Sequence, residues 1–360
     1  MKVVELYGQR YVDLEITPPP VAWQMLRALR HVPPGNAAKG DRKATFNAAL
    51  EQAEQFFTAA TVAGTATRPV LVFYGLAQAG WAVAAADTNT DNNHWRMPGG
   101  HGITTAPVQN AVNGKLADFA LVDDGRGSFT TLATVLSAAS LPAATPLGQL
   151  WGLLAEDQRF ALPGMGTARP LAVSGMGGTG AALVTIGALP AHLLTSSAGD
   201  DSTLQALAWA EQRRQVVQYL AQYPDLAGCA SSLPEGRPLT ITGNSGDAFE
   251  IQVRLESGEG APELSSSDAI VPTTIGYRGQ RGYVFPQVGG SQRPAHPFLL
   301  WWAVCFGLSK LARYEPKGWA ERISVNTSAD AIPIEHLLDR ALVVLPELIH
   351  RTILRVADDE

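Results

Sequence analysis

Arg96 and His101 are the residues whose types and spacing best suit catalysis in this chain. Four residues separate them within a polar stretch at 87–105. An Arg guanidinium suits a phosphate group because its planar fork can donate two hydrogen bonds at once. A His side chain titrates near neutral pH and can therefore move protons. The pair therefore predicts a site that acts on a phosphate group. The alternative, structural interpretation is a loop in which His101 hydrogen-bonds to backbone.

The spacing of Arg96 and His101 resembles the motif of HEPN-type ribonucleases, which act on RNA without a metal. In that family the motif lies near the start of a helix. Here Pro98, Gly99 and Gly100 stand between the two residues and disfavour a helix. The resemblance therefore implies a ribonuclease, or another enzyme acting on nucleic acid, as an alternative function for this loop.

A second group of candidates stands at the end of an apolar segment, residues 298–319. Apolar side chains recur there at helical spacing until Lys310, Arg313 and Tyr314 interrupt them, and Pro316 ends the helix. In the structural interpretation, Arg313 bonds the last helix carbonyls and Tyr314 buries its ring. In the functional interpretation, these three residues bind an anionic ligand or partner beside the loop that carries His101.

Residues 175–180 read Gly-Met-Gly-Gly-Thr-Gly, which satisfies the spacing of a dinucleotide-binding loop. Such a loop needs a following helix and an acidic residue on the next strand. The residues that follow are β-branched and are interrupted by Gly187 and Pro190, while Asp200 and Asp201 lie in a polar stretch. We expect a glycine-rich hairpin or bulge here, and no cofactor.

The sequence contains only weak signatures of a metal site or of a catalytic nucleophile. His94, His101 and Asp91 share one polar stretch, but the seven histidines form no HExxH motif, and cysteine pairing is lacking. Ser174 does not stand in a GxSxG context. We therefore expect no metal site and no nucleophilic triad.

The composition is that of a globular protein, with 360 residues, 46% of them apolar and 17% charged. The formal net charge of −6 argues against non-specific binding to nucleic acid. Cys229 and Cys305 lie far apart, which indicates reduced thiols. The first residues lack the apolar core of a signal peptide, and the longest apolar run is about half of the ~20 residues that cross a bilayer. We expect a cytoplasmic protein without a membrane partner.

The order of predicted elements is helices, then a β-rich stretch, then helices again, which indicates an α+β fold. The helical body would be formed by both ends of the chain around a β-rich middle insert. We expect parts at 1–105, 106–260 and 261–360, with 69–86 and 296–313 as central helices. The predicted helices are 21–31, 44–63, 69–86, 146–156, 203–222, 296–313 and 333–356. The predicted strands lie within 1–16 and at 119–122, 128–131, 170–174, 183–186, 239–242 and 249–255.

Four stretches resemble the YaaC-like family of bacterial proteins. They read RPVLVFYGL at 68–76, GHGITT at 100–105, LARYEP followed by Trp at 311–319, and LPELI at 345–349. The resemblance implies a bacterial cytoplasmic protein that is helical at both ends. For function we expect a non-catalytic interaction or adaptor protein of a bacterial multi-protein system such as phage defence. Its partners would be proteins or further copies of itself.

Overall fold

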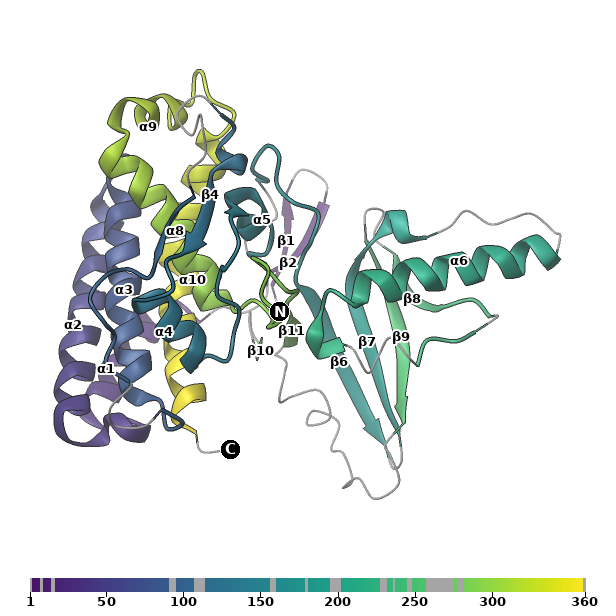
Figure 1. Ribbon diagram of the computed structural model, residues 1–360, viewed down its shortest axis with the longest axis horizontal. Helices are drawn as coiled ribbons and strands as arrows, with labels where there is room; N and C mark the ends of the chain where they lie inside the picture. The colour runs from purple at the N-terminus through teal and green to yellow at the C-terminus, as the bar shows by residue number, and fades with distance from the viewer. Residues whose placement is uncertain are drawn as a thin grey trace. The chain divides into compact units, whose positions relative to one another are not determined.

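The computed structural model shows an α+β protein with two compact units, Met1–Ala168 with Val288–Glu360, and Arg169–Gln287 (Figure 1). Both ends of the chain contribute to the first unit, and the middle of the chain contains most of the strands, as predicted. The three-part division at 105/106 and 260/261 stays a prediction about folding units. The residues that the structure describes are 2–6, 9–13, 17–90, 95–106, 114–155, 160–178, 181–194, 202–226, 232–235, 237–244, 248–256, 275–276 and 282–358.

Helices dominate the first unit and follow the predicted order. Their bounds are α1 Pro19–His31, α2 Gly40–Val62, α3 Arg68–Ala86, α4 Ser128–Val135, α5 Leu147–Gly152, α8 Pro297–Tyr314, α9 Pro316–Arg322 and α10 Ala331–Ala357. The short helices η1 Gly35–Ala38 and η2 Leu116–Asp118 belong to the same unit. Figure 1 shows α3 beside α2 and close to α8 and α10, and all three pack against it.

Helix α3 is the central helix of the first unit, as its sequence predicted. Pro69 stands in its first turn, where a missing N–H costs nothing. Gly75 and Gly80 let neighbours approach: a Cβ at Gly75 would lie 2.8 Å from Phe57, and one at Gly80 would lie 2.8 Å from Trp302. Its length and hydropathy would suit a membrane span, but 67% of its apolar window is buried inside the protein. We therefore interpret it as a core helix.

A small antiparallel sheet lies in the same unit, in the order β3–β4–β5, with β3 at Ile103–Thr105, β4 at Ala120–Asp123 and β5 at Thr145–Pro146. The prediction of a strand at 128–131 is wrong, because Ser128 begins α4. Phe129, Leu132 and Ala133 are buried along one face of that helix. Burial at this spacing decides the conformation of a stretch whose local propensity is ambiguous.

An antiparallel pair of strands begins the chain, β1 at Lys2–Leu6 and β2 at Gln9–Asp13. The sequence predicted a strand in this region. Residues 7–8 lie outside the described part of the chain.

The second unit is an antiparallel sheet packed against the C-terminal half of helix α6 (Ser202–Leu220). Its strand order is β10–β11–β6–β7–β9–β8. The bounds are β6 Leu171–Gly178, β7 Ala181–Pro190, β8 Thr240–Asn244, β9 Ala248–Glu256, β10 Ile275–Gly276 and β11 Gly282–Val284, with short helices η3 Ala191–Leu193 and η4 Pro224–Leu226. Val216 and Leu220 of α6 share the core with Val184, Ile186 and Ile251 of the sheet.

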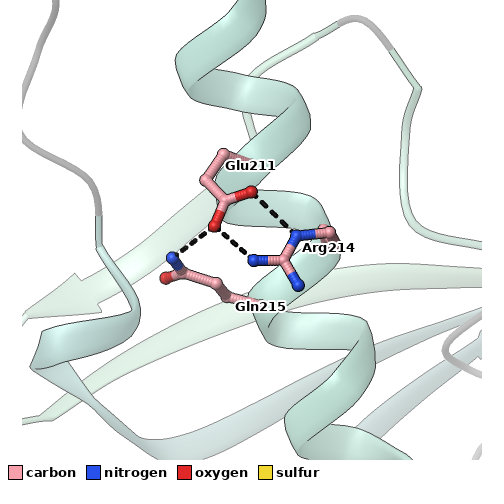
Figure 2. Close-up of polar contacts among 3 residues, drawn as sticks. All are labelled: Glu211, Arg214 and Gln215. Carbon is pink, nitrogen blue, oxygen red and sulfur yellow. Dashed lines mark hydrogen bonds and ion pairs between the residues drawn. The ribbon is translucent and has the colours of Figure 1, made fainter.

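On α6, the carboxylate of Glu211 lies between two side chains of the following turn, as Figure 2 shows. Arg214 donates Nε to Oε2 at 2.8 Å and Nη2 to Oε1 at 2.5 Å. The side-chain amide of Gln215 donates to Oε1 at 2.8 Å. These hydrogen bonds lower the pKa of Glu211 to about 2, because they favour its charged form.

Candidate functional site

His101 lies in a loop whose backbone carbonyls accept hydrogen bonds from the first N–H groups of α4. The carbonyl of Gly100 accepts a hydrogen bond from the N–H of Ser128 at 3.2 Å, and that of His101 accepts from Phe129 at 2.9 Å. The first N–H groups of a helix have no intrahelical acceptor, so the loop supplies the acceptors that α4 needs. The position of His101 therefore depends on the docking of α4.

Two glycines make this close approach possible. Gly102 has φ of +71° and Gly127 has φ of +140°. A Cβ on Gly102 would lie 2.8 Å from the carbonyl carbon of Gly127, and one on Gly127 would lie 2.3 Å from the nitrogen of Gly102. Backbone cannot yield as a flexible side chain can, so both positions need glycine.

The imidazole of His101 packs against aromatic rings of two helices. Its ring centroid lies 5.1 Å from that of Phe73 and 6.2 Å from that of Tyr74, both on α3. The distance to the ring of Phe306, on α8, is 5.8 Å. His101 therefore lies where the loop meets the α3–α8 pair.

The basic residues near the end of α8 also lie where the loop meets the α3–α8 pair. Arg313 donates Nε to the carbonyl oxygen of Ser309 and Nη1 to the hydroxyl of Tyr74, each at 3.2 Å. The Lys310 nitrogen lies 4.9 Å from the ring centroid of Tyr314, and the Arg313 guanidinium lies 5.1 Å from it. We call Tyr74, His101, Lys310, Arg313 and Tyr314 the basic cluster.

The structural interpretation of the helix end is correct for Arg313 and wrong for Tyr314. Arg313 bonds a helix carbonyl as expected, although the carbonyl is that of Ser309, one turn before the end of α8. The side chain of Tyr314 is 62% exposed instead of buried. Lys310, one turn earlier, and Arg313, the preceding residue, both lie over its ring, and such contacts between a cation and an aromatic face are compatible with an exposed ring.

The two cations of the basic cluster form no ion pair within the described part of the chain. Throughout the ranges that the structure describes, neither Lys310 nor Arg313 forms an ion pair with a carboxylate. Two of the five guanidinium N–H groups of Arg313 are used within the protein. Among the described residues, the remaining donors of Arg313 and the Lys310 ammonium have no hydrogen-bond acceptor.

The two cations act on His101. Its pKa is lowered, first by partial burial and then by the charges of Arg313 and Lys310, while Asp124 acts in the opposite direction. This lowering of the pKa favours the neutral form of His101. A neutral imidazole can donate from one nitrogen and accept with the other.

Arg96 has different contacts from the basic cluster. It forms an ion pair with Asp41 at 2.7 Å, and its guanidinium lies 5.3 Å from the ring centroid of Trp95. Residues 95–102 are not helical, as Pro98 and its glycine neighbours predicted. The buried Arg42 lies on the same Trp95 ring and donates to the carbonyl of Asp87 at 2.9 Å. These contacts connect the loop with α2.

Tyr74 and Asp124 belong to the surroundings of His101 but were not among the sequence candidates. Tyr74 could have been noticed, because its hydroxyl is a rare polar group within the apolar segment 69–86. Asp124 follows β4 in an ordinary turn, and its carboxylate accepts from the N–H of Arg126. No sequence signal connects Asp124 with His101.

The glycine-rich stretch forms a hairpin and not a dinucleotide-binding loop. β6 and β7 pair antiparallel from Ala172↔Gly187 to Gly178↔Ala181, so a strand follows where the fingerprint needs a helix. Residues 179–180 of the motif and the acidic pair at 200–201 lie outside the described residues.

His94 and Asp91, considered above as metal ligands, also lie outside the described residues. Within the ranges that are described, no three His, Cys, Asp or Glu side chains gather to hold a metal.

The fold and site define an α+β protein whose helical body, formed by both ends of the chain, carries a basic and aromatic cluster. The chain belongs to the YaaC-like protein family, whose family model matches residues 23–353. This match includes every residue of the basic cluster. Comparison with curated proteins and with solved structures gives no match.

Proposed function

We propose that this protein is a non-catalytic interaction protein that holds an anionic group of a protein partner at the basic cluster. The observation that carries the proposal is that Lys310 and Arg313 lie over an exposed Tyr314 and pair with no described carboxylate. An anion on the partner would supply the missing charge. The exposed ring beside it offers the kind of aromatic contact that protein interfaces favour.

The surroundings of His101 favour binding over catalysis. A catalytic base is held by a hydrogen bond that orients it toward its substrate. In the described part of the chain, the ring of His101 contacts Phe73, Tyr74 and Phe306 and forms no hydrogen bond. Aromatic packing fixes its place without assigning it a proton-transfer partner.

The ribonuclease alternative requires Arg96 and His101 to act on one phosphate. Arg96 is engaged with Asp41 and Trp95, and the cations that act on His101 are instead Arg313 and Lys310. RNA cleavage by the purified protein, lost in both Arg96→Ala and His101→Ala, would restore this alternative.

The setting that we propose is the bacterial cytoplasm, within a multi-protein system of which phage defence is one example. The family resemblance supports this setting, and the residues of the site do not specify it. Self-association and a different protein partner are both compatible with an anion that binds at the cluster.

The test is to purify the tagged protein from a bacterial host and to compare three forms: wild type, Lys310→Glu and Lys317→Glu. Lys317 is a matched control, because it lies on the neighbouring α9, is 93% exposed and pairs with Glu321 at 3.9 Å. Mass spectrometry and the absorbance ratio identify protein and nucleic acid that co-purify. Native mass measurement reports self-association.

We expect a stoichiometric protein partner, or a second copy of the chain, that Lys310→Glu loses and Lys317→Glu retains. Equal recovery with all three forms would contradict a role for the cluster. Bound RNA that depends on Arg96 and His101 would replace the interaction role with the enzymatic one.

A further inference from the structure

We propose that the anion bound at the basic cluster is a doubly charged phosphoryl group, and that His101 takes up a proton when this group binds. This inference rests on the proposed function and specifies the chemistry of its site. It assigns different roles to the fixed cations of α8 and to the histidine of the loop.

The number of donors at the cluster suits a phosphoryl group. Arg313 keeps three of its five N–H groups after its bonds to Ser309 and Tyr74, and Lys310 contributes three more. A carboxylate offers two oxygens, whereas a phosphoryl group offers three strong acceptors and nearly two charges at pH 7. The Tyr74 hydroxyl orients the guanidinium, which lowers the entropic cost of binding.

The charges around His101 explain why binding would draw in a proton. From α8, Arg313 and Lys310 disfavour the imidazolium, and Asp124, which follows β4, favours it. From α3, the phenol ring of Tyr74 packs near the imidazole, with 6.2 Å between the ring centroids. A dianion beside the two cations cancels their repulsion and attracts the imidazolium. His101 would then provide the third positive charge.

Sulfate is the first probe for this proposal, because it carries two charges at every pH of the experiment and so any pH dependence comes from the protein. Calorimetric titration of the full chain, at constant ionic strength, compares sulfate, inorganic phosphate and acetate at about pH 6 and about pH 8. Two buffers of different ionisation enthalpy report proton uptake. We expect sulfate and phosphate to bind more tightly than acetate.

For sulfate, affinity should fall as pH rises, by at most about tenfold per pH unit, which is the limit for one proton. His101→Gln should lose the pH dependence and the proton uptake. Asp124→Asn removes the charge that favours the imidazolium. The pH range in which sulfate affinity rises should therefore move to lower pH. A purely structural role of His101 would not produce this shift.

The outcomes separate this inference from the proposed function. If Lys310→Ala abolishes sulfate binding at both pH values but His101→Gln keeps the full pH dependence, proton uptake by His101 is wrong and the anion site stands. If acetate binds as tightly as sulfate, or phosphate does not bind, the phosphoryl assignment is wrong. If Lys310→Ala changes neither sulfate binding nor partner recovery, the proposed function is also wrong.

Discussion

Arg313 and Tyr74 are joined by a hydrogen bond of 3.2 Å although they lie 239 positions apart in the chain. The bond connects the last turn of α8 with the second turn of α3, the two apolar helices at the centre of the first unit. It also gives the guanidinium a defined orientation beside His101. One contact thus serves both the packing of the helical body and the geometry of the basic cluster.

Tyr74→Phe removes only the hydroxyl that accepts from Arg313. We expect the free energy of unfolding to fall by about 1 kcal/mol, the usual net value of such a hydrogen bond. We also expect weaker sulfate binding, since the guanidinium loses its orientation. Urea unfolding and calorimetric titration measure the two effects.

Tyr314→Phe is the matched control, because the ring under Lys310 and Arg313 remains and the altered hydroxyl belongs to an exposed side chain. It should leave both quantities unchanged. Equal behaviour of the two variants would show that the Arg313–Tyr74 bond does not support the cluster.

Gly102→Ala places a methyl group against the backbone of Gly127 at a position where φ is +71°. The two effects together should lower the free energy of unfolding by at least about 2 kcal/mol. Gly99→Ala, in the same loop, meets no atom within 4 Å and should be tolerated. Thermal or urea unfolding of both variants checks this, and similar stability of the two would argue against a tight Gly102–Gly127 contact.

His296 makes stability depend on pH through the start of α8. Its Nδ1 accepts from the N–H of Phe298 at 3.1 Å. Burial, and to a lesser extent the charge of Arg355, lower its pKa to about 3. In the unfolded chain this histidine binds a proton near pH 6.5, well above its pKa in the folded protein. The unfolded state therefore takes up the proton first, and the free energy of unfolding falls as pH drops from about 6.5 toward about 3.

The variant His296→Asn keeps a side-chain oxygen that can accept from Phe298 and removes the titrating ring. Between about pH 6 and pH 4, its free energy of unfolding should fall less steeply than that of the wild type. The difference between the two slopes should reach at most about tenfold in the unfolding equilibrium constant per pH unit. His31→Asn, on the exposed end of α1, should leave the slope of the wild type. Urea unfolding across this range provides the measurement, and parallel slopes for all three proteins would refute the prediction.

Glu211 should remain ionised to unusually low pH, because its pKa is lowered to about 2 by Arg214 first and by Gln215 second. Any stabilisation from this carboxylate is complete above about pH 4.5 and is lost as pH falls toward about 2. Arg214→Ala should raise the pKa of Glu211 toward 4.5, and Gln215→Ala should raise it less. Carboxyl chemical shifts followed by NMR across this pH range measure the pKa of Glu211. Equal pKa changes in the two variants would contradict the prediction.

The main helices could be predicted because their signals are local. The segments at 69–86 and 296–313 are apolar on nearly every side and carry Pro69 and Pro297 in their first turns, which is typical of buried helices. Helix α4 could not be predicted in this way. Its start depends on acceptors at Gly100 and His101 and on the close approach of Gly102 to Gly127, and no local pattern encodes these contacts.

The sequence by itself determined the chemistry that each part of the cluster can offer: cations and a phenol where an apolar helix ends, and a histidine in a glycine-rich loop. Only the tertiary structure decided that His101 lies with Lys310 and Arg313 while Arg96 pairs with Asp41. The same packing brought Tyr74 to Arg313 and left the cations without a described carboxylate. Side-chain type and local periodicity set helices and their buried faces, but which distant residues meet depends on how those faces pack.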